Sequence, residues 1–493
     1  MSMENTIADR RFTLDRAELI RRLRALLPAH ALLAEEEDMR PYDCDGLTAY
    51  RQLPLLVALP ESEAQVQGIL KVCHELQAPV VARGAATGLS GGATPHPDGV
   101  LMSLAKLKRI VSVDPVSRSA VVQPGVRNLA VSEAAAPYGL YYAPDPSSQI
   151  ACTIGGNVAE NAGGVHCLKY GLTVHNVLRI RAVTIAGEIV EFGNAALDAP
   201  GYDLLALLNG SEGLLAVITE VTVRLTPKPE LAQVVIASFA DVRRAGDAVA
   251  SIIAAGIIPA GLEMMDRKAI HAVEPYVNAG YDMEAEAILL CESDGTPEEV
   301  AEEIGRMTAV LEESGAAGIR VSQNEAERLK FWAGRKAAFP AVGRLTPDYL
   351  CMDGTIPRKR LAEMLDAIAV LSTKYALRCA NVFHAGDGNL HPLIMYDANQ
   401  AGELERAAAF GAEILELSVR FGGTITGEHG VGIEKIMLMA EQFTIAEIDA
   451  FHRVKAAFDE RGLLNPGKGV PTLARCREYT QARVGSVATL PRL

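Results

Sequence analysis

The sequence predicts an α+β protein of two parts, and three observations support this fold class. The first part opens with a strand–helix–strand pattern and then carries two glycine-rich stretches, at residues 83–92 and 153–171. Pro227 and Pro229 then mark a boundary. Beyond it, strand-like segments alternate with amphipathic helices, which indicates a helix-covered sheet with two ferredoxin-like units as the expected form.

The expected elements follow from the spacing of apolar residues. Residues 1–48 read as a helical lead-in, amphipathic over 16–27. The predicted strands of the first part are 53–59, 79–82, 120–123, 177–185 and 215–225, and a helix at 62–76 joins the first two. In the second part we expect strands at 231–239, 285–291, 319–322 and 381–384, and helices at 242–255, 298–313, 360–375, 404–421 and 445–458.

The composition excludes several classes of protein. The 493 residues correspond to about three domain-sized units, and a content of 49% hydrophobic and 22% charged residues excludes wholesale disorder. With 47 Lys and Arg against 61 Asp and Glu, the net charge is −14. Such a chain lacks the excess of cations that binding to nucleic acid or to a membrane surface requires.

The eight cysteines stand singly and form no C-x-x-C motif. This excludes an iron–sulfur protein and a zinc ribbon, and it fits a reducing cytosol. The first 15 residues have no apolar core, so we expect no signal peptide, and no apolar run approaches the ~18 residues of a membrane span. We expect a soluble, cytoplasmic protein, with any association with the inner membrane made through partner subunits.

The first glycine-rich loop, residues 83–92, comes straight after a strand. Glycines let backbone N–H groups approach a ligand closely, and a row of such groups forms an anion-binding nest. The spacing is neither that of a Rossmann dinucleotide site nor that of a P-loop. Taken alone, the loop is as well explained by a tight structural turn.

Two further loops favour a ligand over a turn. One combines residues 144–148 with the stretch 153–164, where Asn157 and Asn161 stand among four glycines. The other is Gly210-Ser211-Glu212-Gly213. Three loops of backbone donors in one domain suit a long, diphosphate-bearing ligand.

Three patterns, R-G-x-x-T-G-L-S-G-G, P-D-P-S-S…T-I-G-G-N-x-x-x-N-A-G-G and G-S-E-G, together resemble the FAD-binding domain of vanillyl-alcohol-oxidase-type (PCMH-type) flavoproteins. The resemblance spans residues 40–470. Over residues 145–176, 331–344, 351–357 and 381–393 the chain resembles the FAD-linked catalytic D subunits of bacterial glycolate oxidases, which are related to D-lactate and D-2-hydroxyglutarate dehydrogenases.

The resemblance implies five segments and a non-covalently bound FAD. The segments are the lead-in (1–48), a PCMH-type FAD-binding domain (49–228), an α+β substrate and metal domain (229–422), a C-terminal segment that completes the active site (423–470) and a tail (471–493). Thr87 stands where some of these flavoproteins have a flavin-linking histidine. The residues expected to bind the cofactor are Arg83, Gly84, Thr87, Gly88, Leu89, Ser90, Gly91, Gly92, Pro144, Asp145, Ser147, Thr153, Gly155, Gly156, Asn157, Asn161, Gly163, Gly164, Glu212, Gly213, Ile218 and Asn465.

Residues 382–393 read as a strand, a turn and a second strand. Asp387 and Gly388 are a strong signal for a two-residue hairpin turn. About that turn, His384 and His391 would pair directly on one face, with Cβ atoms about 5 Å apart. Two facing imidazoles predict a metal clamp, because imidazole is the commonest side-chain ligand.

Glu428 and His429 form a second cluster between glycines. Two histidines and a carboxylate make a three-ligand site with open positions, and on the residues alone either Glu428 or His429 supplies the third ligand. The resemblance assigns Glu428 to a divalent metal (Zn, Mn or Fe) and His429 to proton transfer. It also assigns Arg335, which the sequence alone would place on a helix surface, to the substrate carboxylate.

Two departures from the family pattern bear on the substrate. His391 is followed by Pro392 and Leu393, where the 2-hydroxyglutarate enzymes carry an Asn two residues on. Cys351 stands near their Lys that meets a second carboxylate. The loss of both polar partners favours a substrate with one carboxylate and a small tail.

The expected function is FAD-dependent oxidation of a small 2-hydroxy acid, glycolate first and D-lactate next, by the catalytic subunit of a complex. Arg335 would hold the carboxylate, the metal would lower the pKa of the hydroxyl, His429 would take its proton and the flavin would accept the hydride. The resemblance implies a second flavin-domain subunit and an iron–sulfur subunit as partners. The alternatives are a stand-alone D-2-hydroxyacid dehydrogenase, a non-redox FAD-dependent group transferase and a non-catalytic binding subunit.

Overall fold

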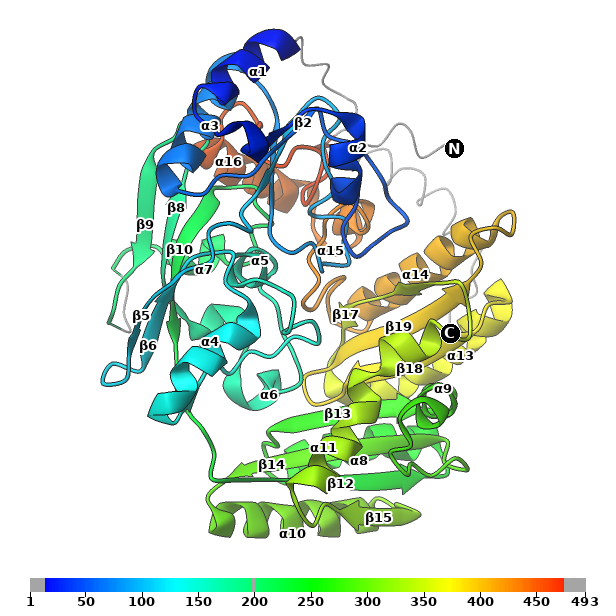
Figure 1. The fold of residues 1–493 in the computed structure, drawn as a ribbon. Helices are drawn as coiled ribbons and strands as arrows, with labels where there is room; N and C mark the ends of the chain where they lie inside the picture. Colours follow the sequence, from blue (N-terminus) through cyan, green and yellow to red (C-terminus); the bar gives the residue numbers. More distant parts are fainter. Residues whose placement is uncertain (1–13, 197–199, 474–493) are drawn as a thin grey trace.

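The computed structural model describes residues 14–196 and 200–473. The first residues of the predicted lead-in, Cys476 and the predicted tail beyond residue 473 lie outside that range. Figure 1 shows two sheet-bearing parts, with the last helices of the chain returning to the first part. The expected α+β class is confirmed.

The first part begins with helices α1 (Arg16–Arg24) and α2 (Glu36–Met39) and a four-stranded sheet. Its strands lie in the order β1 (Leu32–Leu33), β2 (Leu56–Ala58), β4 (Val100–Ser103) and β3 (Val80–Arg83). Helix α3 (Glu63–Leu76) links β2 to β3; Ser62 caps its first turn and its apolar stripe packs into the core of this sheet. The predicted strand–helix–strand opening is confirmed, with β4 inserted between its two strands.

A five-stranded antiparallel sheet follows. Its strands lie in the order β5 (Ile110–Asp114), β6 (Ser119–Val122), β10 (Val217–Arg224), β8 (Val177–Val183) and β9 (Ile189–Gly193). The accompanying elements are α4 (Asn128–Ala135), β7 (Leu140–Tyr141), α5 (Ile154–Glu160), α6 (Cys167–Tyr170), α7 (Leu204–Leu208) and β11 (Thr226–Pro227). Helix α5 is formed by the second glycine-rich stretch, which places its N-terminus beside the loop after β3.

The second part contains one eight-stranded sheet. Its first half runs β12 (Leu231–Phe239), α8 (Val242–Ala254), β13 (Gly261–Asp266), α9 (Arg267–Val277), β14 (Ala287–Gly295), α10 (Pro297–Glu313) and β15 (Gly318–Val321). The strand order β15-β12-β14-β13 makes this half a split β-α-β unit of the ferredoxin-like kind. One of the two expected units is therefore present in full.

The second half extends the same sheet through the β13–β18 pairing. It consists of β16 (Asp348–Cys351), β17 (Gly354–Thr355), α13 (Leu361–Tyr375), β18 (Cys379–His384), β19 (Asn389–Tyr396) and α14 (Glu403–Arg420). After α14 the chain turns at Gly422, whose φ is 88°, and Thr424 then bridges Thr355. This turn sends the chain toward the other part of the molecule, so the second expected unit has no fourth strand within the described residues.

Helices cover both faces of the large sheet. The core on one face contains apolar side chains of α8, α10, α13 and α14. The core on the other face contains those of α9, α11 (Glu325–Lys336) and α12 (Ala338–Val342). A sheet covered on both sides explains why β18 and β19 are buried along their whole length.

The last helices, α15 (Met439–Gln442) and α16 (Ile445–Phe458), lead the chain back to the first part (Figure 1). Leu464 forms a parallel bridge with Val80 at the start of β3, and Leu463 and Leu464 join the core of the four-stranded sheet. Segments from both ends of the sequence therefore build the surroundings of the first glycine-rich loop.

Candidate active site

A cavity of about 430 Å³ lies between the glycine-rich loops of the first part and the loop that follows α14. Most of the predicted cofactor-binding residues line it: Arg83, Gly84, Thr87, Gly88, Leu89, Gly92, Ser147, Thr153, Gly155, Gly156, Asn157, Glu212, Gly213 and Ile218. His391, Glu428 and His429 line it as well. The candidate cofactor site and the candidate chemical site thus share one space.

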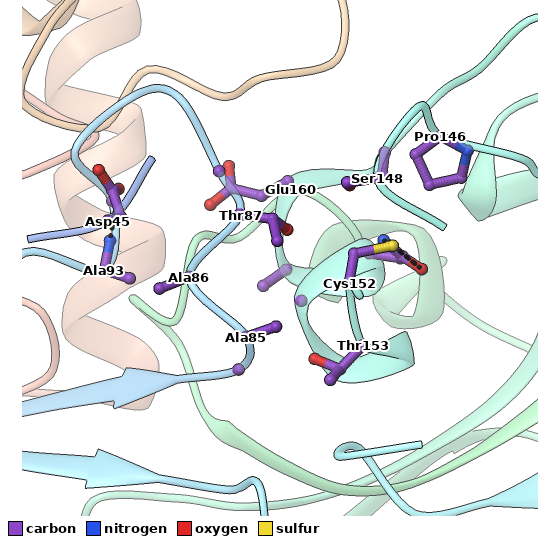
Figure 2. A pocket seen from close by; sticks show the side chains of 18 of the residues that line it. Asp45, Ala85, Ala86, Thr87, Ala93, Pro146, Ser148, Cys152, Thr153 and Glu160 are labelled. Atoms are coloured by element: carbon purple, nitrogen blue, oxygen red, sulfur yellow. Dashed lines mark hydrogen bonds between the residues drawn. The ribbon is translucent and has the colours of Figure 1, made fainter. Parts of the chain in front are cut away.

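The two glycine-rich segments face each other across this cavity. Figure 2 shows Ala85, Ala86 and Thr87 on one side and Cys152 and Thr153, at the start of α5, on the other. A Cβ on Gly88 would meet no atom within 4 Å, so the backbone there borders open space. The Thr153 hydroxyl is buried without a hydrogen-bond partner. A bare backbone and an unsatisfied hydroxyl fit a ligand that approaches the main chain closely.

The remaining predicted cofactor residues do not line the cavity, but several of them shape its wall. They are Ser90, Gly91, Pro144, Asp145, Asn161, Gly163, Gly164 and Asn465. The Ser90 carbonyl accepts hydrogen bonds from the N–H groups of Ile433 and Glu434. The Asn465 side chain donates to the carbonyls of Gly92 and Glu212. These contacts fix the glycine loop against the C-terminal segment.

The hairpin that carries the two histidines has a longer turn than the sequence predicts. His384 pairs with Asn389, and His391 pairs with Val382, so the turn contains the four residues 385–388. The predicted direct pairing of His384 with His391 is wrong, because Asp387 and Gly388 end the turn and do not form all of it. The two histidines are instead diagonal neighbours on the same face, with ring centroids 4.9 Å apart.

Glu428 joins both histidines. Its Oε1 lies 3.2 Å from His384 Nε2 and 3.3 Å from His391 Nε2, and these three atoms are close enough to share one ion. His391 Nε2 is buried and makes no well-aligned hydrogen bond, although Glu428 Oε1 and Asp353 Oδ1 lie 3.3 and 3.5 Å away. Two imidazoles, one of them with a ring nitrogen that has no hydrogen bond, and one carboxylate fit a divalent metal that prefers nitrogen and oxygen ligands.

Asp353 explains the position of Glu428. It follows β16, is fully buried and accepts hydrogen bonds from the N–H groups of Gly427, Glu428 and His429. Burial opposes its ionisation, yet the neighbouring His429 and Lys435 hold the pKa of Asp353 well below its usual range. These bonds hold the loop that carries Glu428. Asp353 also lies close enough to His391 and His429 for the three to form a second group that could hold an ion.

His429 stacks on His391, with ring centroids 5.0 Å apart and planes at 12°. Burial lowers the pKa of His429 to about 4. The ring is therefore neutral at pH 7 and able to accept a proton. Its Nδ1 is buried without a hydrogen-bond partner.

Arg335 lies at the end of α11 and is almost completely buried, contrary to the helix-surface position that the sequence alone suggested. Its Nε donates to Glu263 Oε2 at 2.6 Å, and its Nη2 has no hydrogen-bond partner. The neighbouring Lys336 lines the cavity.

Four carboxylates at or beside the site were not among the predicted site residues: Asp45 and Glu160, which line the cavity, and Glu263 and Asp353, which contact the cluster. Asp353 had a signal, because an acidic residue stands two positions after a strand and precedes Gly354. Glu263 had none, because it interrupts the apolar pattern of β13 and its partners are 72 and 121 residues away.

Within the described residues, every helix is too short or too polar to cross a membrane.

Comparisons with known proteins match both parts of the chain. Residues 54–193 match the family described as FAD binding domain, and residues 228–469 match the family described as FAD linked oxidases, C-terminal domain. The glycolate oxidase subunit GlcD of Escherichia coli (strain K12) is 61% identical over 465 residues, which cover 94% of this chain and 93% of that protein. A D-lactate dehydrogenase of Anaerostipes hadrus is 32% identical over 92% of this chain and 97% of its own.

The solved structures support the fold. The 4-ethylphenol oxidase of Gulosibacter chungangensis superposes with a TM-score of 0.77 at 16% identity, covering 92% of this chain and 97% of that one. At this identity the likeness concerns the fold alone. Together with the match to the FAD-binding domain, it confirms the vanillyl-alcohol-oxidase-type architecture expected from the three glycine motifs.

Proposed function

The chain belongs to the family of FAD-linked oxidases, and on this premise we propose that it oxidises a small 2-hydroxy acid, glycolate to glyoxylate in the first place. The observation that carries the proposal is the shared cavity, in which His391, Glu428 and His429 face the same space as the glycine-rich loops. A cofactor on the loops and a substrate on the cluster would then be in contact.

When bound, the FAD supplies the acceptor for two electrons, and a divalent metal supplies Lewis acidity toward the substrate oxygens. We propose that the FAD is held without a covalent link, by the loop that contains Thr87 and by the N-terminal turn of α5. We propose His384, His391 and Glu428 as the metal ligands, which the convergence of their atoms supports.

His429 is our candidate for the general base. Its Nδ1 is buried without a hydrogen-bond partner, so this nitrogen is free to accept the hydroxyl proton of a substrate. It lines the cavity next to Glu428, so a substrate bound at the ligand cluster lies within its reach.

Arg335 is our candidate for the substrate carboxylate. Its Nε is already taken by Glu263, and its buried Nη2 has no hydrogen-bond partner. Arg335 does not line the cavity, whereas its neighbour Lys336 does, so a carboxylate would have to reach the guanidinium beyond the cavity wall. A carboxylate is the acceptor that a guanidinium matches best.

The preference for a substrate with a small tail rests on the sequence, in which Cys351 and Leu393 stand at or near positions where the 2-hydroxyglutarate enzymes carry polar side chains. In the structure, Cys351 and Leu393 pair across β16 and β19, are buried in the core and do not line the cavity.

Anaerobic titration of the purified yellow protein tests the proposal. We expect glycolate to bleach the flavin most efficiently, D-lactate to follow, and L-lactate and D-2-hydroxyglutarate to leave it oxidised. Preference for D-lactate would instead support a stand-alone D-lactate dehydrogenase, which the relative in Anaerostipes hadrus favours. A flavin that no hydroxy acid reduces would support a group transferase or a binding subunit.

We further propose that the chain acts as the catalytic subunit of a complex with a second flavin-domain subunit and an iron–sulfur subunit. The word subunit in the name of the Escherichia coli relative supports a complex. Any contact with the inner membrane would be made by those partners.

A further inference from the structure

We propose that Glu263 is a positioning residue that orients the metal ligand His384 and the carboxylate-binding Arg335 with a single carboxylate. The inference rests on the function proposed above. Glu263 lies on β13 in the middle of the large sheet and is completely buried.

One oxygen of Glu263 orients His384. In the antiparallel pairing of β13 with β18, Met264 faces Phe383, so the residues one step further, Glu263 and His384, stand opposite each other. Glu263 Oε1 lies 2.7 Å from His384 Nδ1. A carboxylate oxygen accepts, so Nδ1 donates to Glu263, while Nε2 on the other side of the ring lies 3.2 Å from Glu428 Oε1. With Nδ1 held in this way, Nε2 is the atom that would ligate a metal.

The other oxygen orients Arg335. Glu263 Oε2 accepts from Arg335 Nε at 2.6 Å, and both side chains are 1% exposed. This bond sets the plane of the guanidinium and leaves Nη2 buried without a partner. The distance between a metal on His384 and a carboxylate on Arg335 is thereby set by one rigid side chain.

Two hydrogen-bond donors meet at the two oxygens of Glu263, and this makes the residue hard to replace. A glutamine has one oxygen, so its amide NH₂ would face either the His384 Nδ1–H or the Arg335 Nε–H, donor against donor. An aspartate keeps the charge but is shorter by one methylene group, so it reaches only one of the two partners.

A purely structural role for Glu263 is the rival explanation, and Glu292 provides the matched control. Glu292 lies on the adjacent strand β14, paired with Gly261, and is 2% exposed. It also joins a histidine, His166 Nε2 at 3.1 Å, to an arginine, Arg328 Nη1 at 2.8 Å. His166, unlike His384, does not belong to a group of side chains within the described residues that could share one metal ion.

The test compares wild type, Glu263→Gln and Glu292→Gln as full-length flavoproteins. Each is stripped of metal with a chelator, and binding of Mn²⁺ and of Zn²⁺ is measured by calorimetry, with flavin content and melting temperature recorded. We expect Glu263→Gln to weaken metal binding roughly tenfold or more, as loss of a partner of a metal-bound histidine does. Its KM for glycolate should rise as well. Glu292→Gln should keep the metal affinity within about twofold, with a comparable drop in melting temperature.

Equal metal affinity in wild type and Glu263→Gln, or equal losses in the two variants, would overturn the positioning role alone. A wild type that binds neither metal would remove the proposed metal site and the positioning role with it. Flavin reduction by glycolate reports separately on the rest of the proposed function. Should Glu263→Gln fail to fold, Glu263→Asp is measured in the same way. Because an aspartate loses one partner or the other, unchanged metal affinity together with an unchanged KM for glycolate overturns the inference.

Discussion

A Cβ atom on Gly163 would stand 2.5 Å from Glu428 Oε2, so the second glycine-rich stretch packs directly against the candidate metal ligand. The third glycine of the pattern T-I-G-G-N-x-x-x-N-A-G-G therefore makes room for a carboxylate 265 residues later in the chain. Gly163 does not line the cavity, and its prediction as a cofactor-binding residue stays a prediction.

Replacement of Gly163 by Ala should displace Glu428 and reduce metal binding. Gly305, on α10, is the control, because a Cβ there meets no atom within 4 Å. We expect the purified Gly163→Ala protein to contain less than half the metal of wild type by elemental analysis, and Gly305→Ala to contain as much as wild type. Full metal content in Gly163→Ala would show that Glu428 can shift without loss of the site.

Removal of His384 or His391 by substitution with Ala should lower bound divalent metal and abolish turnover, while flavin content stays near that of wild type. The two rings supply two of the three proposed ligand atoms, whereas the glycine loops lie elsewhere in the cavity. Metal and flavin are measured on the same preparations. His271→Ala is the control, because His271 lies on α9 and contacts only the Met283 carbonyl within the described hydrogen bonds. Undiminished metal in both variants of the cluster would contradict the ligand assignment.

Arg335→Lys should lower kcat/KM for glycolate by about tenfold to a hundredfold, with FAD binding unchanged. Lysine keeps the charge but loses the planar guanidinium that Glu263 orients. Steady-state kinetics with an artificial dye measure the effect. Arg328→Lys, on the same helix but paired with Glu292, should keep normal kinetics. If Arg335→Lys behaves like wild type, the substrate carboxylate binds elsewhere, and Lys336 on the cavity wall becomes the next residue to test.

Lys468 should make stability depend on pH. It is buried, donates to the Gly92 carbonyl and to Asn465, and burial lowers its pKa to about 7 from an ordinary value of 10.5. Between these values the unfolded chain binds the proton and the folded chain does not, so this lysine stabilises the fold increasingly as pH rises. From pH 7 to 9, the free energy of unfolding of wild type should gain about 2 kcal/mol over that of Lys468→Met, measured by urea denaturation. A constant difference between the two proteins would contradict the lowered pKa.

Once reduced, the flavin of the isolated chain should be reoxidised only slowly by air or by NAD⁺. The sequence has no clustered cysteines for an iron–sulfur centre and no C-x-x-C-H for haem. We expect glycolate to reduce the flavin rapidly in stopped-flow measurements, and an artificial dye or a co-expressed iron–sulfur partner to restore turnover. Fast oxygen-dependent turnover with stoichiometric peroxide would identify a free-standing oxidase instead.

Where local signals are strong, the sequence predicts the fold closely. Residues 231–239 and 445–458 were expected as a strand and a helix, and they match β12 and α16 in both bounds. Helix α16 begins with a capping box between Thr444 and Glu447, which a sequence reveals directly. Strand β13 was missed, because Glu263 and Asp266 interrupt its apolar pattern and are buried only through partners on other elements.

For the candidate site, likewise, the sequence predicts some features and not others. Glu428, His384 and His391 stand out because their residue types are rare among glycines and apolar strands, and the structure brings them together. The register of the hairpin could not be predicted, because the turn signal Asp387-Gly388 does not say where a four-residue turn begins. The pairing of Glu263 with Arg335 could not be predicted either, because it depends on how β13 and α11 pack against each other.

The parallel bridge between Val80 and Leu464 has a consequence for synthesis of the protein on the ribosome. The carbonyl group of Gly92 accepts hydrogen bonds from Asn465 and Lys468, which are translated some 370 residues later. During synthesis, the edge of β3 and the first glycine-rich loop therefore lack these contacts until almost the whole chain has emerged from the ribosome. We therefore expect the cofactor to be loaded after translation. Until then the open edge of β3 is a surface that chaperones would have reason to protect.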